Sequence, residues 1–317
     1  MSNNSILAAG IDTGKGKLDV ALAHTAAGLQ VENDSTGWHK LAAWLRRHKI
    51  ERVGIEASGG YERGVVAQLR EKGLSVVVFQ PIQVRAYATF RLQRAKNDRI
   101  DAGLIAACTA AATTVREAPD PRFQAFAEHL TLIEQIEEDI VRFKTRLEAF
   151  RDPRYRERLH AEIKRLKTSR LAEIKVLLAD LKCHSDLARR LLLVESVPGI
   201  GLRTALALLI RMPELGTLPR EQVAALAGLA PFDDDSGKAH GLRRIAGGRG
   251  RLRKSLFAAA LPAAFNWNPR LVELYARLTA AGKPHKVALI ACARKLLIFA
   301  NTVVARGTPW TEHHASI

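Results

Sequence analysis

The start of the chain alternates short apolar segments with turn residues. Residues 6–12 (ILAAGID), 17–23 (KLDVALA) and 29–31 (LQV) have the length and composition of strands. Turn-forming residues at 13–16 and 26–28 separate them. The pattern predicts consecutive strands joined by tight turns, which is an antiparallel meander.

Helical and extended patterns alternate after the meander. Thr36 is a candidate N-cap for a helix that runs to Lys49. Four segments are then expected in order: a buried strand at 52–57 (RVGIEA), an amphipathic helix at 61–73, a buried strand at 74–80 (LSVVVFQ), and a helix from Asp98 to about Ala112. Antiparallel strands followed by alternating helices and strands predict an α/β domain with a mixed sheet and helices on its faces, as in RNase H-like proteins.

A long charged stretch from Arg122 to about Arg190 has a helical pattern. It lacks glycine, and its one proline is Pro153. Apolar residues recur every three or four positions: Leu130, Ile133, Ile136, Ile140 and Phe143, then Leu159, Ile163, Leu166, Leu171, Ile174, Leu177 and Leu181. Two long helices joined near Asp152 would form an antiparallel coiled-coil hairpin. Its apolar stripe favours self-association, with packing inside one chain as the alternative.

The last third of the chain is predicted to be mainly helical. Pro198 to Gly201 (PGIG) would make a tight turn between two helices, a helix-hairpin-helix motif whose Gly199 and Gly201 amides can bind a phosphate oxygen. A glycine-rich connection that only packs helices is the alternative. A helix at 219–229 precedes a loop rich in Gly and Arg, and two helices broken at Gly282 and Pro284 follow.

The chain has 317 residues, enough for two or three domains. The changes of pattern predict an RNase H-like domain over residues 1–115, an oligomerising helical hairpin over 116–190 and a helical C-terminal domain over 191–317.

Charge narrows the class of partner. The sequence contains 49 Lys and Arg against 32 Asp and Glu, a net charge of +17, which indicates a nucleic-acid backbone as partner. No apolar run approaches a membrane span and the first residues do not form a signal peptide, so a cytoplasmic protein is expected. The cysteines Cys108, Cys183 and Cys292 lie far apart in helical patterns, which argues against disulfides and a zinc site.

Four acidic residues lie where strands end or a helix begins: Asp12, Glu56, Asp98 and Asp101. Asp98 and Asp101 are three residues apart and so project from one face of the first helical turn. Taken singly, each has a structural alternative as a cap, turn or strand-end residue. Taken together they favour one carboxylate cluster, whose mutual repulsion a Mg2+ or Mn2+ ion would relieve.

Basic residues crowd the segment from Lys238 to Lys254 and recur in the last helices. The candidates for binding nucleic acid, besides Gly199 and Gly201, are Arg203, Lys238, Arg243, Arg244, Arg249, Arg251, Arg253, Lys254, Lys283, Lys286, Arg294 and Lys295. Ser236 is the only hydroxyl in this loop before Ser255. A serine beside glycine is ordinarily a turn residue, so the residues alone do not make it a nucleophile.

A resemblance to a known family covers nearly the whole chain. The motifs that carry it are GIDTGKGKLDVAL, GIEASGGYE, KNDRIDAGLIA, VPGIGLRTALALL, LAGLAPFDDDSGK, RRIAGGRGRLRKSLF and LTAAGKPHKVALIACARKLL. In this order they resemble the DEDD-type insertion-sequence transposases, whose N-terminal domain is similar to the RuvC resolvase. The central charged helices match by type only.

The resemblance implies roles for single residues. It assigns Asp12, Glu56, Asp98 and Asp101 to the acidic tetrad and Ser236 to the serine nucleophile of the C-terminal domain. It further implies metal-assisted strand exchange of donor and target DNA through a phosphoserine link, a structured guide (bridge) RNA that pairs with both DNAs, and a dimer or tetramer whose composite site takes Ser236 and the acids from different protomers.

Three other functions fit parts of the sequence. A RuvC-like nuclease or junction resolvase would use the same metal site with activated water and no serine. A sugar-kinase-like ATPase would use GIDTGKGKLD as a phosphate hairpin, although the chain has no second Gly-rich phosphate loop. A nucleic-acid-binding protein without catalysis would need the acids only for structure.

Overall fold

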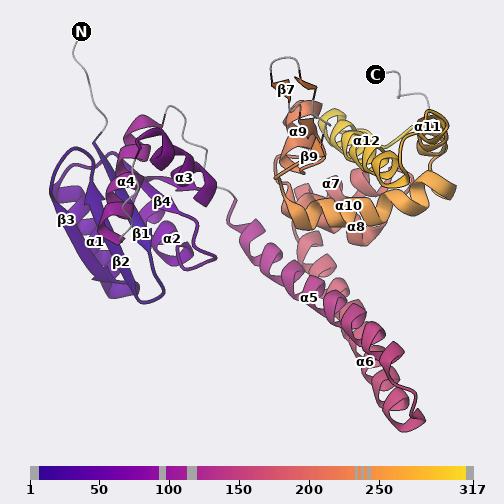
Figure 1. The fold of residues 1–317 in the computed structure, drawn as a ribbon. Helices are drawn as coiled ribbons and strands as arrows, with labels where there is room; N and C mark the ends of the chain where they lie inside the picture. The colour runs from indigo at the N-terminus through magenta and orange to yellow at the C-terminus, as the bar shows by residue number, and fades with distance from the viewer. Residues whose placement is uncertain are drawn as a thin grey trace. The chain divides into compact units, whose positions relative to one another are not determined.

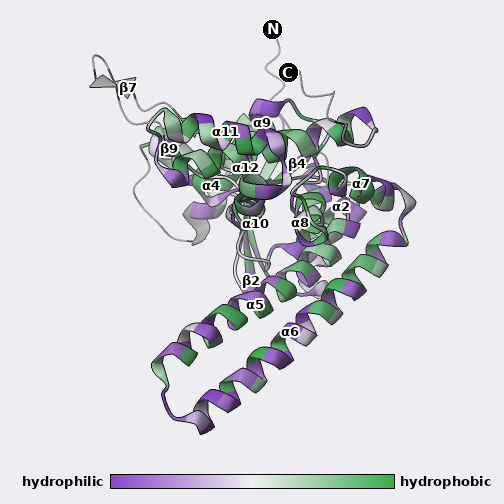
Figure 2. Ribbon diagram, turned by 90° about the vertical axis from the view of Figure 1, so that its right-hand side faces the viewer, coloured by the Kyte–Doolittle hydropathy of each residue, from purple (hydrophilic) through white to green (hydrophobic). Residues whose placement is uncertain are grey.

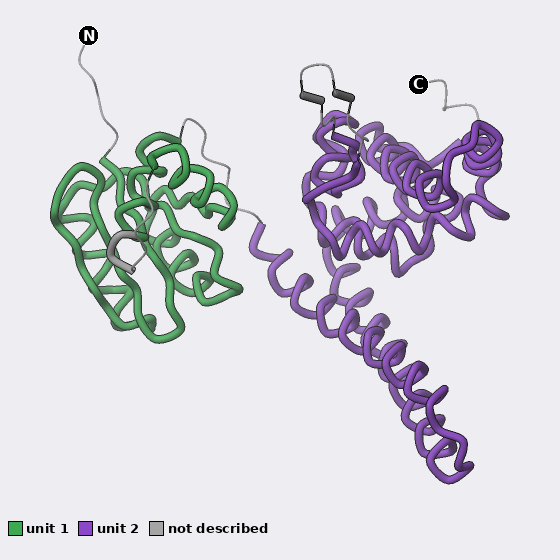
Figure 3. The backbone as a smooth tube through the Cα atoms, in the orientation of Figure 1, with its two compact units in different colours: residues 1–118 green, residues 119–317 purple. Residues whose placement is uncertain are grey.

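The protein divides into two compact units. The structure is a computed structural model, and it describes residues 7–92, 98–112, 120–232, 235–236, 239–240 and 244–311. Unit 1 spans Met1–Ala118 and unit 2 spans Pro119–Ile317 (Figure 3). Each unit has its own hydrophobic core, so each is described by itself.

Unit 1 is built on a five-stranded sheet with the order β3-β2-β1-β4-β5 (Figure 1). Its strands are β1 (Ala8–Thr13), β2 (Lys17–Leu22), β3 (Gly28–Glu32), β4 (Arg52–Glu56) and β5 (Ser75–Phe79). The first three pair antiparallel as a meander, while β4 pairs parallel with β1 and β5 parallel with β4. The predicted mixed sheet is therefore confirmed.

Helices cover both faces of this sheet. On one face, Ile11 and Leu18 pack with Leu41 and Leu45 of α1 (Ser35–Arg47) and with residues of α2 (Arg63–Glu71). On the other face lies α4 (Asp98–Ala111), and α3 (Pro81–Phe90) packs beside it. The central strands β1 and β4 are thus buried on both sides, as expected for strands rich in Val, Ile and Ala.

Helix α4 approaches the sheet closely at two glycines. A Cβ at Gly10 would overlap backbone atoms of Ala102 and Ala106, and a Cβ at Gly54 would overlap the Thr109 side chain. Gly10 and Gly54 are register partners on β1 and β4. Together they form a smooth strip on which the small, fully buried residues of α4 lie.

Two details of unit 1 differ from the sequence predictions. The cap of α1 is Asp34, whose carboxylate accepts a hydrogen bond from the Gly37 amide at 2.7 Å, and not Thr36. Asp34 lies one residue outside the helix, where an extended backbone lets the side chain turn back. The structure also contains α3, which the sequence pattern did not predict because its apolar stripe is weak.

Unit 2 begins with an antiparallel helical hairpin. Helix α5 (Arg122–Ala149) and α6 (Pro153–Lys182) pack along their length, with Asp152 capping α6 through the Arg154 amide. Hydrophobic and hydrophilic segments alternate along both helices (Figure 2). The predicted second helix is interrupted, however, because α6 ends at Lys182 and α7 (Ser185–Glu195) starts a new direction.

The rest of unit 2 is a helical body around one large core. Its elements are α7, α8 (Leu202–Arg211), α9 (Arg220–Leu226), α10 (Gly250–Pro262), a π-helical turn at Ala263–Trp267, α11 (Pro269–Ala280) and α12 (His285–Arg306). The break between α11 and α12 at Gly282 and Pro284 agrees with the sequence. Between α9 and α10 the chain forms short antiparallel pairs, β6 (Pro231–Phe232) with β9 (Arg244–Ile245) and β7 (Asp235–Ser236) with β8 (Ala239–His240).

Helix α12 is long and apolar enough to cross a membrane by length and composition, although the sequence has no uninterrupted apolar run of that length. More than half of that apolar window is buried inside unit 2. Leu289, Leu296 and Leu297 are among its fully buried residues. The apolar character of α12 is that of a core helix.

The glycine strip gives a stability test. Gly10→Ala should lower the free energy of unfolding of unit 1 by about 3 kcal/mol, because the new methyl group meets backbone and α4 must move. Gly103→Ala is the matched control, since a Cβ there meets nothing within 4 Å and alanine favours the helix by roughly 0.5–1 kcal/mol. Urea denaturation of both variants measures the difference, and equal stabilities would contradict the close approach.

Candidate active site and nucleic-acid interface

Asp12 and Glu56 lie side by side at the carboxyl ends of two parallel strands. The register of β1 and β4 pairs Gly10 with Gly54 and Ile11 with Ile55, so Asp12 and Glu56 are the next positions on neighbouring strands. Because side chains alternate along a strand, both carboxylates project to the face of Gly10 and Gly54. That is the face that α4 covers.

Helix α4 carries Asp101 toward the same edge. At the far end of the helix, the Arg52 guanidinium donates a hydrogen bond to the Ala112 carbonyl at 2.6 Å, which places the end of α4 at the beginning of β4. The first turn of α4 therefore points toward the carboxyl end of β1. Asp101 lies one turn before Ile105 and two before Thr109, both buried against the sheet, so it shares their stripe. Asp98 is the first residue of α4, and its side chain lies outside the described residues.

The acids supply oxygen donors of the kind that Mg2+ and Mn2+ prefer. Within the part of the chain that the structure describes, three or more His, Cys, Asp or Glu side chains nowhere gather in a metal-binding arrangement. The side chain of Asp98, the fourth acid, lies outside that part. The donor chemistry of Asp12, Glu56 and Asp101 fits a divalent cation, and their residue-level role stays a prediction.

A further carboxylate faces Asp12, and sequence reasoning did not single it out. Asp19 of β2 is the register partner of Asp12 and so points to the same face of the sheet. It accepts a hydrogen bond from Gln30 at 2.6 Å and pairs with Lys17 at 3.1 Å. The sequence signal that could have identified Asp19 is the alternating pattern of KLDVAL. If this strand pairs with the first one as a hairpin, Asp19 lies opposite Asp12.

Asn33 and Glu62 hold the loops at this edge. The Asn33 amide donates hydrogen bonds to the carbonyls of Gly14 at 2.9 Å and Tyr61 at 3.1 Å, which joins the loop after Asp12 to the loop after Glu56. The Glu62 carboxylate accepts hydrogen bonds from the amides of Ser58 and Gly60 at 3.1 and 2.8 Å. Although burial opposes it, these hydrogen bonds leave the pKa of Glu62 below its ordinary value.

Ser236 is the last residue of β7 and pairs with Ala239 of β8. Its side chain, like all of Lys238 and Arg243, lies outside the described residues. The segment predicted as a loop therefore contains short strand pairs. Two-residue strands leave too little periodicity in the sequence to be recognised.

Several predicted nucleic-acid contacts have partners inside unit 2. Arg203 pairs with Glu137 at 2.9 Å, Arg251 with Glu134 at 2.6 Å, Arg249 with Glu214 at 2.6 Å and Lys254 with Glu138 at 3.6 Å. The Arg253 guanidinium donates a hydrogen bond to the Gly247 carbonyl at 2.6 Å.

Glu134 is the centre of this charge network. It lies on α5, its side chain is 11% exposed, and it contacts Arg211 at 2.7 Å as well as Arg251 and, at 3.7 Å, Arg203. The network joins the hairpin to α8 and α10. It gives these arginines a structural role, and binding of nucleic acid by them stays a prediction.

Other predicted contacts border an open groove. Arg244, Lys286, Arg294 and Lys295 line it, between α9, β9 and α12. Lys283 is exposed in the connection just before α12.

The PGIG turn also has a packing role. Gly199 has a φ of 94°, and a Cβ there would collide with the Ala263 side chain, so the turn needs glycine to contact the π-helical turn after α10. Gly201 precedes α8 and is exposed, with open space around its Cα.

Two family models match the chain. A DEDD transposase model of the IS110 type matches residues 9–152, and the model described as "Transposase IS116/IS110/IS902 family" matches residues 191–276. Together they cover more than two thirds of the chain, and all of α6 lies between them.

Sequence relatives agree with these models. Pilin gene-inverting proteins of Moraxella bovis and Moraxella lacunata are each 26% identical over 319 residues, which is 96% of this chain and 97% of theirs. The insertion element IS110 uncharacterized 43.6 kDa protein of Streptomyces coelicolor is 34% identical over 117 residues, 36% of this chain and 29% of that protein. A solved structure of Thermus thermophilus RuvC matches with a TM-score of 0.27 and 19% identity, over 32% of this chain and 91% of that one.

Glu62 makes unit 1 sensitive to pH. Since its folded pKa is lowered from 4.5, its charged form stabilises the fold above that pH, and this stability is lost as the pH falls through the folded pKa. Glu62→Gln should therefore cost roughly 1 kcal/mol at neutral pH and progressively less in acid. Urea denaturation at several pH values measures this, with the exposed Glu71→Gln as control. A penalty that does not depend on pH would contradict the assignment.

Glu134 should be far more important for stability than its neighbours. Glu134→Gln leaves the guanidinium groups of Arg203, Arg211 and Arg251 facing one another, which should cost about 3 kcal/mol of unfolding free energy. Glu138→Gln on the same helix removes only a loose pair with Lys254 and should change stability by less than about 0.5 kcal/mol. Similar unfolding free energies for the two variants in denaturant titrations would contradict a central role of Glu134 in the network.

Proposed function

Because this chain belongs to the IS110 family of transposases, we propose that it cuts and rejoins DNA of a mobile element through a phosphoserine intermediate. Family membership makes it a DNA-modifying recombinase. The observation that supports the chemistry best is the adjacency of Asp12 and Glu56 at the ends of parallel strands, with α4 directing Asp101 toward them. An edge of that kind can present carboxylates to a phosphodiester.

A divalent cation, Mg2+ or Mn2+, would be held by Asp12, Glu56, Asp98 and Asp101. When bound, it would polarise the scissile phosphate and stabilise the charge on the attacking and leaving oxygens. The four carboxylates of this chain would orient the phosphate and carry the negative charge that balances the cation. Asp19, across from Asp12, would add negative charge to the same face and so strengthen its attraction for a cation.

Ser236 would supply the nucleophile. Its hydroxyl loses a proton, its oxygen forms a new bond to phosphorus, and the bond from phosphorus to one strand oxygen breaks. The leaving strand oxygen takes up a proton. The hydroxyl end of the exchanged strand can then attack the same phosphorus and release Ser236, which regains its proton, so one phosphoester bond is always kept and no ATP is needed. Nearby Arg244, exposed on β9, would neutralise charge on the phosphoryl group.

The partners follow from the same family. We propose donor and target DNA, a structured guide (bridge) RNA that reads sequence by base pairing, and a dimer or tetramer assembled through the coiled-coil hairpin of α5 and α6. The PGIG turn would act as a helix-hairpin-helix contact to a phosphate backbone. A division of domains at residues 115 and 190 fits these roles. The site of action would be the cytoplasm.

One finding favours rejoining over hydrolysis. The full-length relatives from Moraxella are named for inverting a gene, and inversion requires that cut ends be joined again. A water-activating nuclease would leave free ends. We therefore rank recombination through a covalent link above simple cleavage.

Ser236 gives the decisive experiment. Ser236→Ala should abolish the covalent protein–DNA adduct on a nicked suicide substrate and reduce recombination at least about a thousandfold, because the nucleophile is gone. DNA binding measured by fluorescence anisotropy should not change. The adduct is scored by its altered mobility in a denaturing gel.

Ser255→Ala is the matched control, since Ser255, on α10, is the next hydroxyl in the sequence and its loss should leave both readouts unchanged. Full cleavage by Ser236→Ala without any adduct would replace the proposal with the water-activating nuclease. Asp101→Asn distinguishes the third possibility, because undiminished recombination in that variant would show that the acids are only structural.

A further inference from the structure

A broad groove with an apolar floor and basic rim runs beside α12. Its volume is about 710 Å3. Leu274, Ile290 and Ile298 contribute to the floor, and Lys286, Arg294 and Lys295 are among the basic residues that line it. A surface of this composition suits a ligand that combines a flat apolar group with negative charge.

Three basic residues of the groove have no described carboxylate within ion-pair distance, although Glu221, which also lines the groove, interacts with Arg294 over a longer distance. Among the residues that the structure describes, no ion pair engages Lys286, Arg294 or Lys295, in contrast to the arginines around Glu134. Burial, and after it the charges of Arg220 and Arg270, lower the pKa of Lys295. An anion in the groove would relieve this repulsion.

A cluster of three rings adjoins the groove. Phe265 lies 4.9 Å from Tyr275 and 6.4 Å from His285 between ring centroids, and the Tyr275 hydroxyl is 2.6 Å from the His285 ring. Tyr275 follows Leu274 of the groove floor, and His285 precedes Lys286 of the rim. Phe265 is 47% exposed. Aromatic residues make up only 6% of the sequence, so an exposed group of rings is unusual for this chain. An exposed ring cluster beside basic residues is the arrangement that stacks unpaired bases.

The backbone fixes Phe265 in this exposed position. Pro262 has no amide hydrogen, and the chain after it widens into a π-helical turn closed by a bond from the Asn268 amide to the Ala263 carbonyl at 3.0 Å. The buried Asn268 side chain donates a hydrogen bond to the Pro198 carbonyl at 2.9 Å. The turn is therefore attached to the PGIG segment and holds the ring without a large loss of entropy on binding.

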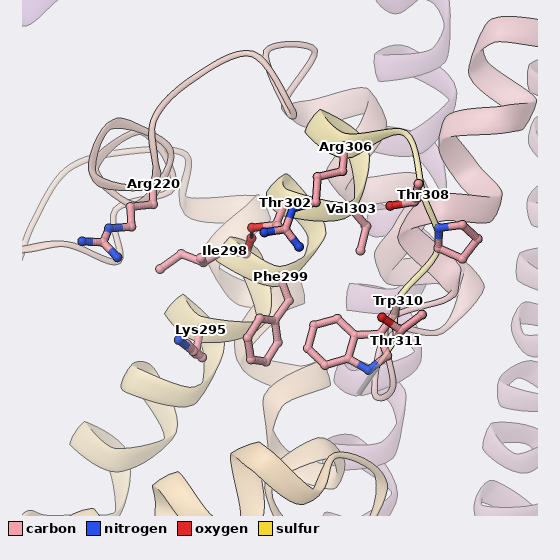
Figure 4. Close-up of a pocket in the computed structure, with 11 residues that line it drawn as sticks. Arg220, Lys295, Ile298, Phe299, Thr302, Val303, Arg306, Thr308, Trp310 and Thr311 are labelled. Carbon is pink, nitrogen blue, oxygen red and sulfur yellow. Dashed lines mark hydrogen bonds between the residues drawn. The ribbon is translucent and has the colours of Figure 1, made fainter. Parts of the chain in front are cut away.

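A neighbouring cavity does not offer the same site. It lies between Phe299, Trp310 and Arg306 and shares Arg220 and Lys295 with the groove (Figure 4). Its volume is about 50 Å3, which admits water and excludes a nucleotide. The open groove, at about 710 Å3, has room for a nucleotide.

We propose that the groove and the ring cluster bind an unpaired strand of nucleic acid, whose base stacks on Phe265 while its phosphates contact Lys286, Arg294 and Lys295. The inference rests on the proposed function, since a guided recombinase has to hold strands that are not in a duplex. It adds a site for such a strand. The ligand is an unpaired nucleotide, and either guide RNA or displaced DNA can supply it.

Short fluorescent single strands of RNA and of DNA, titrated with the full chain, test the site by anisotropy. Phe265→Ala should weaken binding of the preferred strand about tenfold. Phe265→Trp should bind as tightly as the unchanged protein, because a base can stack on any aromatic ring. Lys286→Gln should weaken binding and reduce its dependence on salt. The strand type that loses more affinity identifies the source, and either result supports the proposal.

Control variants separate stacking at Phe265 from general attraction to a basic protein. Tyr155→Ala removes a similarly exposed ring, from the tip of the hairpin, and should not alter single-strand binding. Affinity for duplex DNA should survive Phe265→Ala. The proposal is overturned if Phe265→Trp binds single strands as weakly as Phe265→Ala, or if Phe265→Ala binds them as tightly as the unchanged protein. It is also overturned if Phe265→Ala changes only the mass measured by sedimentation, which would make the cluster an interface between chains. Because binding needs no strand transfer, a failed adduct experiment with Ser236 would leave this result intact.

Discussion

The contact between α4 and the sheet at Gly10 and Gly54 determines the geometry of unit 1. With hydrogen in place of side chains at these positions, the helix backbone lies against the strands. The same contact sets how far Asp101 stands from the carboxyl ends of β1 and β4. The proposed catalytic edge of two strands and a helix would depend on that spacing, because carboxylates displaced by about one ångström would lose a shared ligand.

A second constraint operates in unit 2, where several basic residues are engaged in ion pairs and others are not. Glu134, Glu137 and Glu138 on α5 pair with basic residues of α8 and α10, and so attach the hairpin to the helical body. In the part of the chain that the structure describes, the basic rim of the groove at Lys286, Arg294 and Lys295 has no such ion pairs. The net charge of +17 therefore does not describe one uniform basic surface.

Sequence patterns predicted the mixed sheet, the hairpin and the final helix pair, because each has a strong apolar period. They also placed Asp12 and Glu56 at strand ends, and the parallel register then made them neighbours. The features that the sequence did not predict depend on tertiary contacts. The approach of α4 requires knowing which glycines face a helix, and the partners of Arg203 and Arg251 lie on a helix more than sixty positions away. Ser236 is different again, since its proposed role comes from the family resemblance and not from any local pattern.

The length of the hairpin has a mechanical consequence. A helix of 28 residues such as α5 extends roughly 42 Å at 1.5 Å per residue, and its packing against α6 makes the pair stiff. The ion pairs of Glu134, near the middle of α5, attach the hairpin to α8 and α10, and the tip at Phe150 and Tyr155 lies beyond them. Glu134 lies roughly 22 Å from the end of α5, so a rotation of about five degrees at Glu134 would move the tip by about 2 Å. A force on the tip would be transmitted through Arg251 to the start of α10, which follows the short strands that include Ser236.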